Sequence, residues 1–239
     1  MKTCNPNPIS RRDGFTLIEL LVVMAVIAVL AAMIFPVAGI VKRNAAIKRV
    51  QTQMRAIESA IETYKQNVKV YPPENPVSPA NPVHLYPHLN MLYYELGGAR
   101  LVGTEYQPLN GNGNATELAL RTFLGNGVPI DQNSFGIVNL TRGAAGVDDD
   151  EKQSARNCIP NIEPSRYLAL DSGVTVLGVT DVGLTMLTNT ASGKIINPWR
   201  YTSTRATNNV GSYDLWVDIT VGGKNYRICN WNDKYITLP

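Results

Sequence analysis

Hydrophobic and polar positions divide the chain into segments of different period. No residue from Leu20 to Val41 is charged, and a helix over this run would be roughly 33 Å long, enough to cross a ~30 Å hydrocarbon core. The apolar positions that follow recur every three or four residues, at Ile47, Val50, Met54, Ile57, Ile61 and Tyr64. This spacing is typical of a helix face that packs on other elements, so we predict one helix from about 15 to 67. A coiled coil needs about three to four sustained heptads, and this stripe is shorter. We therefore expect it to pack against a sheet.

The region after this helix lacks a long period. Residues 71–87 are rich in proline and are predicted to run extended over the surface. Two short helices are predicted at Leu85–Leu96 and Ala115–Leu124, the second capped by Asn114 or Thr116 and closed by Gly125.

From about residue 134 the period shifts toward two, which indicates strands. The strongest signal is a hairpin, residues 213–221 and 224–229, because Gly222-Gly223 suits a two-residue primed turn. Other predicted strands are Phe135–Leu140, Tyr167–Leu170, Val174–Val179 and Ile195–Ile196. The pattern predicts an α+β fold, with a long N-terminal helix packed on a C-terminal antiparallel sheet.

Composition excludes several classes of protein. With 44% hydrophobic and 17% charged residues, the 239-residue chain is neither disordered nor a polytopic membrane protein. Its formal charge of +3 offers no basic field for nucleic acid, so we expect no nucleic-acid partner.

Glu19 is the most informative single residue, because it lies within the apolar segment. A carboxylate in a membrane costs several kcal/mol, roughly, unless it is paired, and is therefore a functional candidate. Cleavage after Gly14 would make Phe15 the N-terminus, and its amine could then neutralise Glu19 of a neighbouring helix in a staggered stack. An ordinary secretory signal has a shorter apolar region, followed by its cleavage site, and no use for this acid.

Residues 14–19, Gly-Phe-Thr-Leu-Ile-Glu, follow a short basic leader and precede the apolar run. This string resembles the prepilin signature of type IV pilins and type II secretion pseudopilins. The resemblance implies cleavage between Gly14 and Phe15 by prepilin peptidase, N-methylation of Phe15, and assembly through Phe15 and Glu19 into a filament. It also implies a helix kink at Pro36.

The resemblance also implies a domain plan and a location. Residues 1–14 are the expected leader peptide, 15–41 the transmembrane and filament-core half of the helix, 42–70 its amphipathic half, and 71–239 the globular head. We expect a single-pass inner-membrane protein with its head in the periplasm and, after assembly, a periplasmic filament. Expected partners are identical or related pseudopilin subunits, prepilin peptidase, an inner-membrane assembly platform and membrane lipid.

The C-terminal part resembles the major pseudopilin of type II secretion. The elements that carry this are residues 197–201 (Asn-Pro-Trp-Arg-Tyr), 212–216 (Ser-Tyr-Asp-Leu-Trp) and 230–231 (Asn-Trp). That subunit usually binds calcium in an acidic loop after the second element, where this chain has the single acid Asp218. Calcium takes about six to eight oxygen ligands, and Asp218 with Asp233 supplies too few, so we expect no cofactor and interpret Asp218 as an ordinary hairpin or surface acid. Residues 100–165 form a longer insertion than a compact major pseudopilin has.

Nothing in the sequence predicts catalysis. His84 and His88 are four residues apart, but Pro87 and the absence of a nearby cysteine argue against a metal site. The acids at 148–151 are expected to be a solvated loop, and no hydrolase, metalloprotease or P-loop motif occurs. We therefore expect no catalytic residues, no bound metal and no enzyme activity.

Two cysteines, Cys158 and Cys229, would remain after loss of Cys4 with the leader. Outside the cytoplasm they could form a disulfide worth roughly 4 kcal/mol in the chain-entropy model, or remain as two buried thiols. The sequence leaves both alternatives open.

The leading interpretation is a structural subunit of a type II secretion pseudopilus that supports protein export. A type IV pilin of a surface pilus is the first alternative. A signal-anchored extracytoplasmic binding protein or enzyme is the second, and it predicts an uncleaved bond between Gly14 and Phe15.

Overall fold

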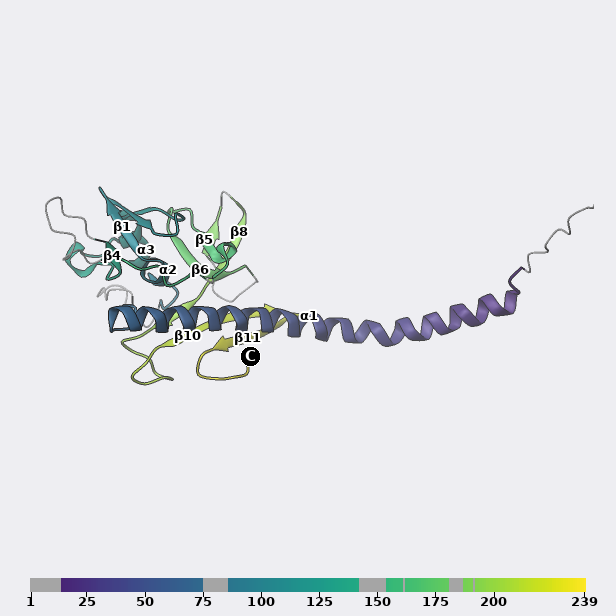
Figure 1. The fold of residues 1–239 in the computed structure, drawn as a ribbon. Coiled ribbons are helices and arrows are strands. Elements are labelled where there is room, and N and C mark those ends of the chain that lie inside the picture. The colour runs from purple at the N-terminus through teal and green to yellow at the C-terminus, as the bar shows by residue number, and fades with distance from the viewer. Residues whose placement is uncertain (1–13, 75–85, 142–153, 161, 181–186, 191) are drawn as a thin grey trace, which may run out of the picture. The chain divides into compact units, whose positions relative to one another are not determined.

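The computed structural model describes residues 14–74, 86–141, 154–160, 162–180, 187–190 and 192–239, apart from the side chains of 33–38, 134 and 194 (Figure 1). It forms two compact units, Met1–Asn44 and Ala45–Pro239. The architecture is α+β, an N-terminal helix packed with mainly antiparallel sheets, which is consistent with a pilin-like fold and confirms the predicted class.

Helix α1 (Leu17–Val68) is within two residues of its predicted bounds at each end. Its assignment continues through Pro36, a position whose side chain lies outside the described set, so the predicted kink there stays a prediction. Among the described side chains, no helix is both long enough and apolar enough to cross a membrane. The predicted span, 20–41, includes the undescribed side chains 33–38.

The second half of α1 supplies the core of the larger unit. Every member of the predicted stripe is at least nine-tenths buried: Ile47, Val50, Met54, Ile57, Ile61 and Tyr64. They share one apolar cluster with Leu215, Val217 and Ile219 of strand β10, which confirms that the stripe packs into the head.

The C-terminal sheet has the strand order β12-β11-β10-β9 (Figure 1). Its strands are β9 (Arg200–Thr202), β10 (Asp214–Val221), β11 (Lys224–Cys229) and β12 (Ile236–Leu238). The predicted hairpin is confirmed, since β10 and β11 pair and are joined by Gly222 and Gly223. Both glycines have positive φ, 61° and 74°, as a type I′ turn requires.

Two further four-stranded sheets complete the head. One has the order β5-β6-β8-β7 and is antiparallel, and the other has the order β3-β2-β1-β4, in which β1 and β4 are parallel. The strands of the first are β5 (Tyr167–Ala169), β6 (Thr175–Val179), β7 (Leu187–Asn189) and β8 (Lys194–Pro198). Those of the second are β1 (Ala99–Val102), β2 (Glu105–Pro108), β3 (Ala115–Thr116) and β4 (Leu140–Thr141).

Three strand predictions, at 167–170, 174–179 and 195–196, match β5, β6 and β8. The strand predicted at Phe135–Leu140 is wrong except at its last residue. A 3-10 helix at Gln132–Ser134, capped by Asp131, precedes it, and residues 135–139 are irregular. A second 3-10 turn, Pro164–Arg166, leads into β5.

The two short helices fare differently. Helix α3 (Glu117–Leu124) begins after Thr116, whose hydroxyl accepts from the Ala119 N–H at 3.2 Å, so Thr116 is the cap and Asn114 is not. Helix α2 (Leu92–Gly97) is much shorter than the predicted Leu85–Leu96, because the described residues that precede it form a turn around Pro87, which has no N–H to donate.

Glu95 in α2 joins the C-terminal end of α1 to the rest of the larger unit. Its side chain is fully buried and accepts from the Tyr64 hydroxyl at 2.9 Å and from the backbone N–H groups of Val138 and Asn139 at 2.9 and 3.1 Å. The Asn139 amide donates in turn to the carbonyls of Glu95 and Arg156, both at 2.7 Å. Despite these donors, burial raises the pKa of the Glu95 carboxyl.

Asp214, at the start of β10, is a second buried acid that holds backbone from another segment. Its buried carboxylate accepts from three successive backbone N–H groups, those of Thr207, Asn208 and Asn209, at 2.9, 3.0 and 2.9 Å. A single acid on β10 thus fixes the loop that arrives from β9.

Gly223→Ala should lower the free energy of unfolding by about 1–2 kcal/mol, because an L-residue is strained at this positive φ although a Cβ would meet no neighbour. Urea unfolding of the full chain in detergent is the measurement. Gly136→Ala is the matched control, since this glycine also has open space around it but no positive φ. Equal effects of the two substitutions would contradict the assignment of the turn.

The raised pKa of Glu95 predicts a pH dependence. The folded state holds this proton more tightly, so the stability from protonation is full below the ordinary value of 4.5 and is lost as pH rises through the raised pKa. In urea unfolding between about pH 4 and about pH 8, Glu95→Gln should therefore lose less stability than the unmodified chain as pH rises. Glu62→Gln, an exposed change on α1, should keep the original slope. An unchanged slope in Glu95→Gln would contradict the assignment.

Candidate functional site

The segment before α1 exposes the predicted cleavage point. Gly14, Phe15 and Thr16 are not helical, and Phe15 is 81% exposed. A Cβ at Gly14 would meet no atom within 4 Å, so the peptide bond between Gly14 and Phe15 is open from this side. Residues 1–13 of the predicted leader lie outside the described residues.

Thr16 and Glu19 form a capping box at the start of α1. The Thr16 N–H and hydroxyl both donate to Glu19 Oε2 at 2.8 Å, and the Glu19 N–H donates to the Thr16 hydroxyl at 3.3 Å. This reciprocal pattern satisfies amides that the first helical turn would otherwise leave without partners. Thr16, which the sequence reasoning passed over, could have been found from the Thr-x-x-Glu spacing.

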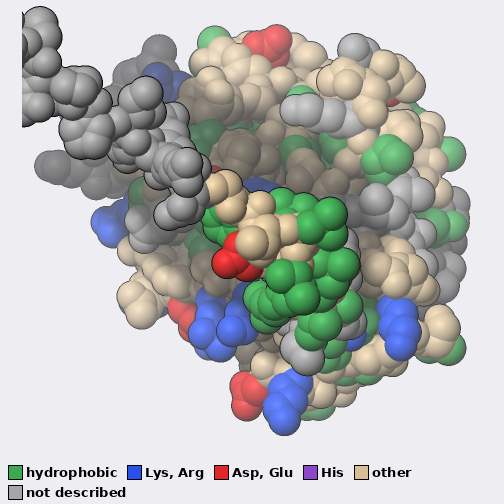
Figure 2. Space-filling model, turned by 90° about the vertical axis from the view of Figure 1, so that its right-hand side faces the viewer, with side chains coloured by type: hydrophobic (Ala, Val, Ile, Leu, Met, Phe, Trp, Pro, Cys, Tyr) green, Lys and Arg blue, Asp and Glu red, His purple; other side chains and the backbone are tan. Residues whose placement is uncertain are grey.

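An exposed apolar surface surrounds this acid. Phe15, Ile18, Val22 and Val23 line a shallow hollow with Glu19. Large hydrophobic side chains from Leu17 to Leu30 are at least half exposed, and the end of α1 that faces the viewer in Figure 2 presents mostly hydrophobic groups. Oε1 of Glu19 accepts no hydrogen bond from the described residues. The first unit therefore combines an unburied apolar helix with one available carboxylate oxygen.

The same residues match a known family. Residues 9–35 match the family model of the prokaryotic N-terminal methylation motif. This match supports a pilin-like or pseudopilin-like protein, processed by prepilin peptidase and assembled into pilin-type filaments, and suggests a membrane-anchored N-terminus. No curated protein and no solved structure matches the chain.

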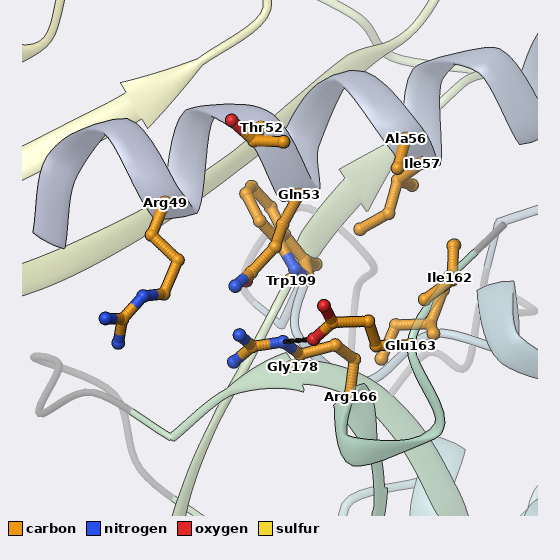
Figure 3. Close-up of a pocket in the computed structure, with 11 residues that line it drawn as sticks. Arg49, Thr52, Gln53, Ala56, Ile57, Ile162, Glu163, Arg166, Gly178 and Trp199 are labelled. Atoms are coloured by element: carbon orange, nitrogen blue, oxygen red, sulfur yellow. Dashed lines mark ion pairs between the residues drawn. The ribbon is translucent and has the colours of Figure 1, made fainter. Parts of the chain in front are cut away.

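A groove of about 280 Å³ lies between the amphipathic half of α1 and the head (Figure 3). Its deepest side chains are apolar and buried: Ile57, Ile162, Leu177 and Trp199. Arg49 on α1 and Arg166 on the 3-10 turn stand at its polar side.

These polar groups are unequally engaged. Arg166 pairs with Glu163 at 3.8 Å, and the Gln53 amide, with its oxygen turned toward the guanidinium, accepts from Arg166 at 2.6 Å. Arg49 is exposed and forms no ion pair within the described part of the chain. The stripe pattern reveals Ile57. The sequence does not show that Arg49 and Arg166 line the same groove, because only the fold brings them there.

The acids and histidines do not form a site among the described residues. Asp218 is buried rather than at the surface, and its carboxylate accepts from Arg227 Nε and Nη2 at 2.7 and 3.0 Å. Asp218 is therefore an acid of the hairpin, as interpreted, paired across it with Arg227, and the alternative of a surface acid is wrong. Asp233 is exposed, and its carbonyl accepts from the Gln51 amide at 3.5 Å.

His84 lies outside the described residues, as do the acids at 148–151. Burial and the neighbouring Arg200 lower the pKa of His88 to about 4, so this imidazole is neutral near pH 7. Within the described ranges, no group of three His, Cys, Asp or Glu side chains could hold a metal ion.

Cys158 and Cys229 are both free and buried, so the disulfide alternative is not formed in this structure. Their surroundings differ: Cys158 accepts from the Asn67 amide at 3.8 Å near the end of α1, whereas Cys229 pairs with Trp216 in the C-terminal sheet. Burial raises the pKa of both thiols, which lowers their reactivity.

Both thiols should therefore be alkylated by iodoacetamide in denaturant without reductant, and both should react slowly in the folded chain. Mass spectrometry of the two peptides measures this. Protection of Cys158 and Cys229 until a reductant is added would show a bridge and contradict the structure.

Proposed function

We propose that the chain is a structural subunit of a type II secretion pseudopilus, a periplasmic filament that supports protein export. The observation that carries this proposal is the exposed bond between Gly14 and Phe15, four residues before the only acid of an apolar helix start. The pseudopilus is favoured over a surface pilus by the C-terminal resemblance, residues 197–201, 212–216 and 230–231.

The exposed apolar helix supports anchoring and assembly. A helix that is hydrophobic around its circumference is stable only when lipid or other helices cover it. Before assembly we expect lipid of the inner membrane to cover residues 15–41, with the head in the periplasm. In the filament, the same residues of neighbouring subunits replace the lipid.

Glu19 selects the register of this packing. Cleavage after Gly14 creates an ammonium group at Phe15, and Glu19 Oε1 is free of hydrogen bonds from the described residues. The amine of an incoming subunit would donate to this carboxylate of its neighbour, a charge-assisted bond that strengthens when the helices exclude water. N-methylation of Phe15 keeps the charge.

The proposal assigns no enzyme activity and no cofactor to the chain. Two buried acids of the head have structural partners instead, Glu95 in Tyr64 and Asp218 in Arg227. The remaining partners of the proposed subunit are prepilin peptidase and an inner-membrane assembly platform.

Glu19→Ala should leave membrane insertion and cleavage largely intact but reduce filament formation roughly tenfold or more, since it removes a hydrogen bond to a charged group. N-terminal sequencing of the membrane fraction measures cleavage, and sedimentation of sheared filaments measures assembly. Glu62→Ala, which removes an exposed acid from α1, is the control and should assemble normally.

Gly14→Glu should block cleavage and so prevent assembly at the earlier step. If the unmodified chain kept its first fourteen residues in cells that contain prepilin peptidase, the proposed function would be wrong.

A further inference from the structure

We propose that the groove beside α1 receives the tip of the β1–β2 hairpin of a second copy of this chain. The inference rests on the proposed filament and names a contact that joins neighbouring heads. It also gives a role to the inserted region, since the hairpin lies where that insertion begins.

The groove has an apolar lining around an empty volume. Ile57, Leu177 and Trp199 reach it from α1, β6 and the turn between β8 and β9. A cavity of 150 Å³, roughly, accepts benzene, so about 280 Å³ is ample for aliphatic side chains. Figure 3 shows Arg49 and Arg166 reaching the same side of this opening.

The hairpin tip has apolar side chains that its own head does not bury. Leu101 and Val102 are 41% and 49% exposed at the end of β1, and Glu105, at the start of β2, is exposed. The tip between them is fixed, because Gly103 has a φ of 63° and the Thr104 carbonyl accepts from the Glu117 N–H at 2.9 Å. A preorganised tip loses little conformational entropy when it binds.

Charge matches the hairpin to the groove. Glu105 offers a carboxylate to Arg49, which forms no ion pair with the described residues. The hairpin also carries the exposed Arg100, whereas Glu163 of the groove already pairs with Arg166 at 3.8 Å, so the charge match rests on Glu105 and Arg49.

The arrangement favours a second copy over contact within one head. Figure 1 places β1 toward the end of the head where α1 finishes, and β5 and β8 toward its other end. Hairpin and groove are thus different patches of one molecule. When such a contact repeats head to tail without closing on itself, it builds a filament, as the proposed function requires.

Cysteine cross-linking of the full chain in cells that process and assemble it tests this contact. Val102→Cys combined with Thr52→Cys should give a ladder of dimers, trimers and longer species on oxidation, because each chain carries both partners. Each single variant, and Val210→Cys with Thr52→Cys, should give no ladder. Val210 is the control because it is 86% exposed elsewhere in the head.

A second set of variants tests the energetics. Val102→Asp should weaken assembly roughly 10- to 100-fold, whereas Val210→Asp should not, because only the first places a charge in an apolar groove. Glu105→Arg should also weaken assembly, and Arg49→Glu in the same chain should restore it.

Each outcome decides the matter. Processed filaments without a ladder, and unaffected by Val102→Asp, would overturn the hairpin contact while the proposed function stands, and would leave the groove to another occupant such as an acyl chain. A cross-link that stops at the dimer would indicate an isologous contact and also overturn it. Failure to remove residues 1–14 would overturn the proposed function and the contact with it.

Discussion

The burial of one stripe of α1 under the C-terminal sheet is the contact on which the head depends. Leu215, Val217 and Ile219 face this stripe, and their strand continues into the Gly222-Gly223 turn that sets the register of β11. A one-residue slip of β10 would turn these three side chains to the other face of the sheet and take Asp218 away from Arg227. Helix and sheet therefore fix each other.

The apolar side chains of the two halves of α1 have different environments. In the half that belongs to the head, apolar side chains such as Val50 and Ile61 are buried by the chain itself. In the first unit they are exposed and require a cover from outside. Glu19 lies in this second environment, where its partner among the described residues is Thr16, at Oε2. The precursor thus holds its acid in a local cap that leaves the other oxygen open to an intermolecular partner.

Sequence patterns revealed the parts of the fold that local periodicity dictates. The stripe Ile47–Tyr64 and the Gly-Gly hairpin were found because spacing and turn chemistry act over a few residues. The hairpin β1–β2 was not found, since its strands alternate poorly and its apolar ends are exposed. Glu95 was missed for a different reason: its partner Tyr64 comes from a distant part of the chain. The partner of Asp218, Arg227, lies directly opposite it in the predicted hairpin, so this pair could have been found from the position of the turn. The N-terminal site was largely readable because all its residues lie within six positions, whereas the groove unites residues more than 100 positions apart.

The loop held by Asp214 has a consequence for variation at the surface. The acceptor is one carboxylate on a strand, and three of its donors at 207–209 are backbone N–H groups, which every amino acid except proline possesses. The side-chain amides of Asn208 and Asn209 add bonds to Asp214 and to the Tyr213 carbonyl. Substitution of these two asparagines would therefore remove the side-chain bonds and keep the three backbone bonds that hold the loop against β10.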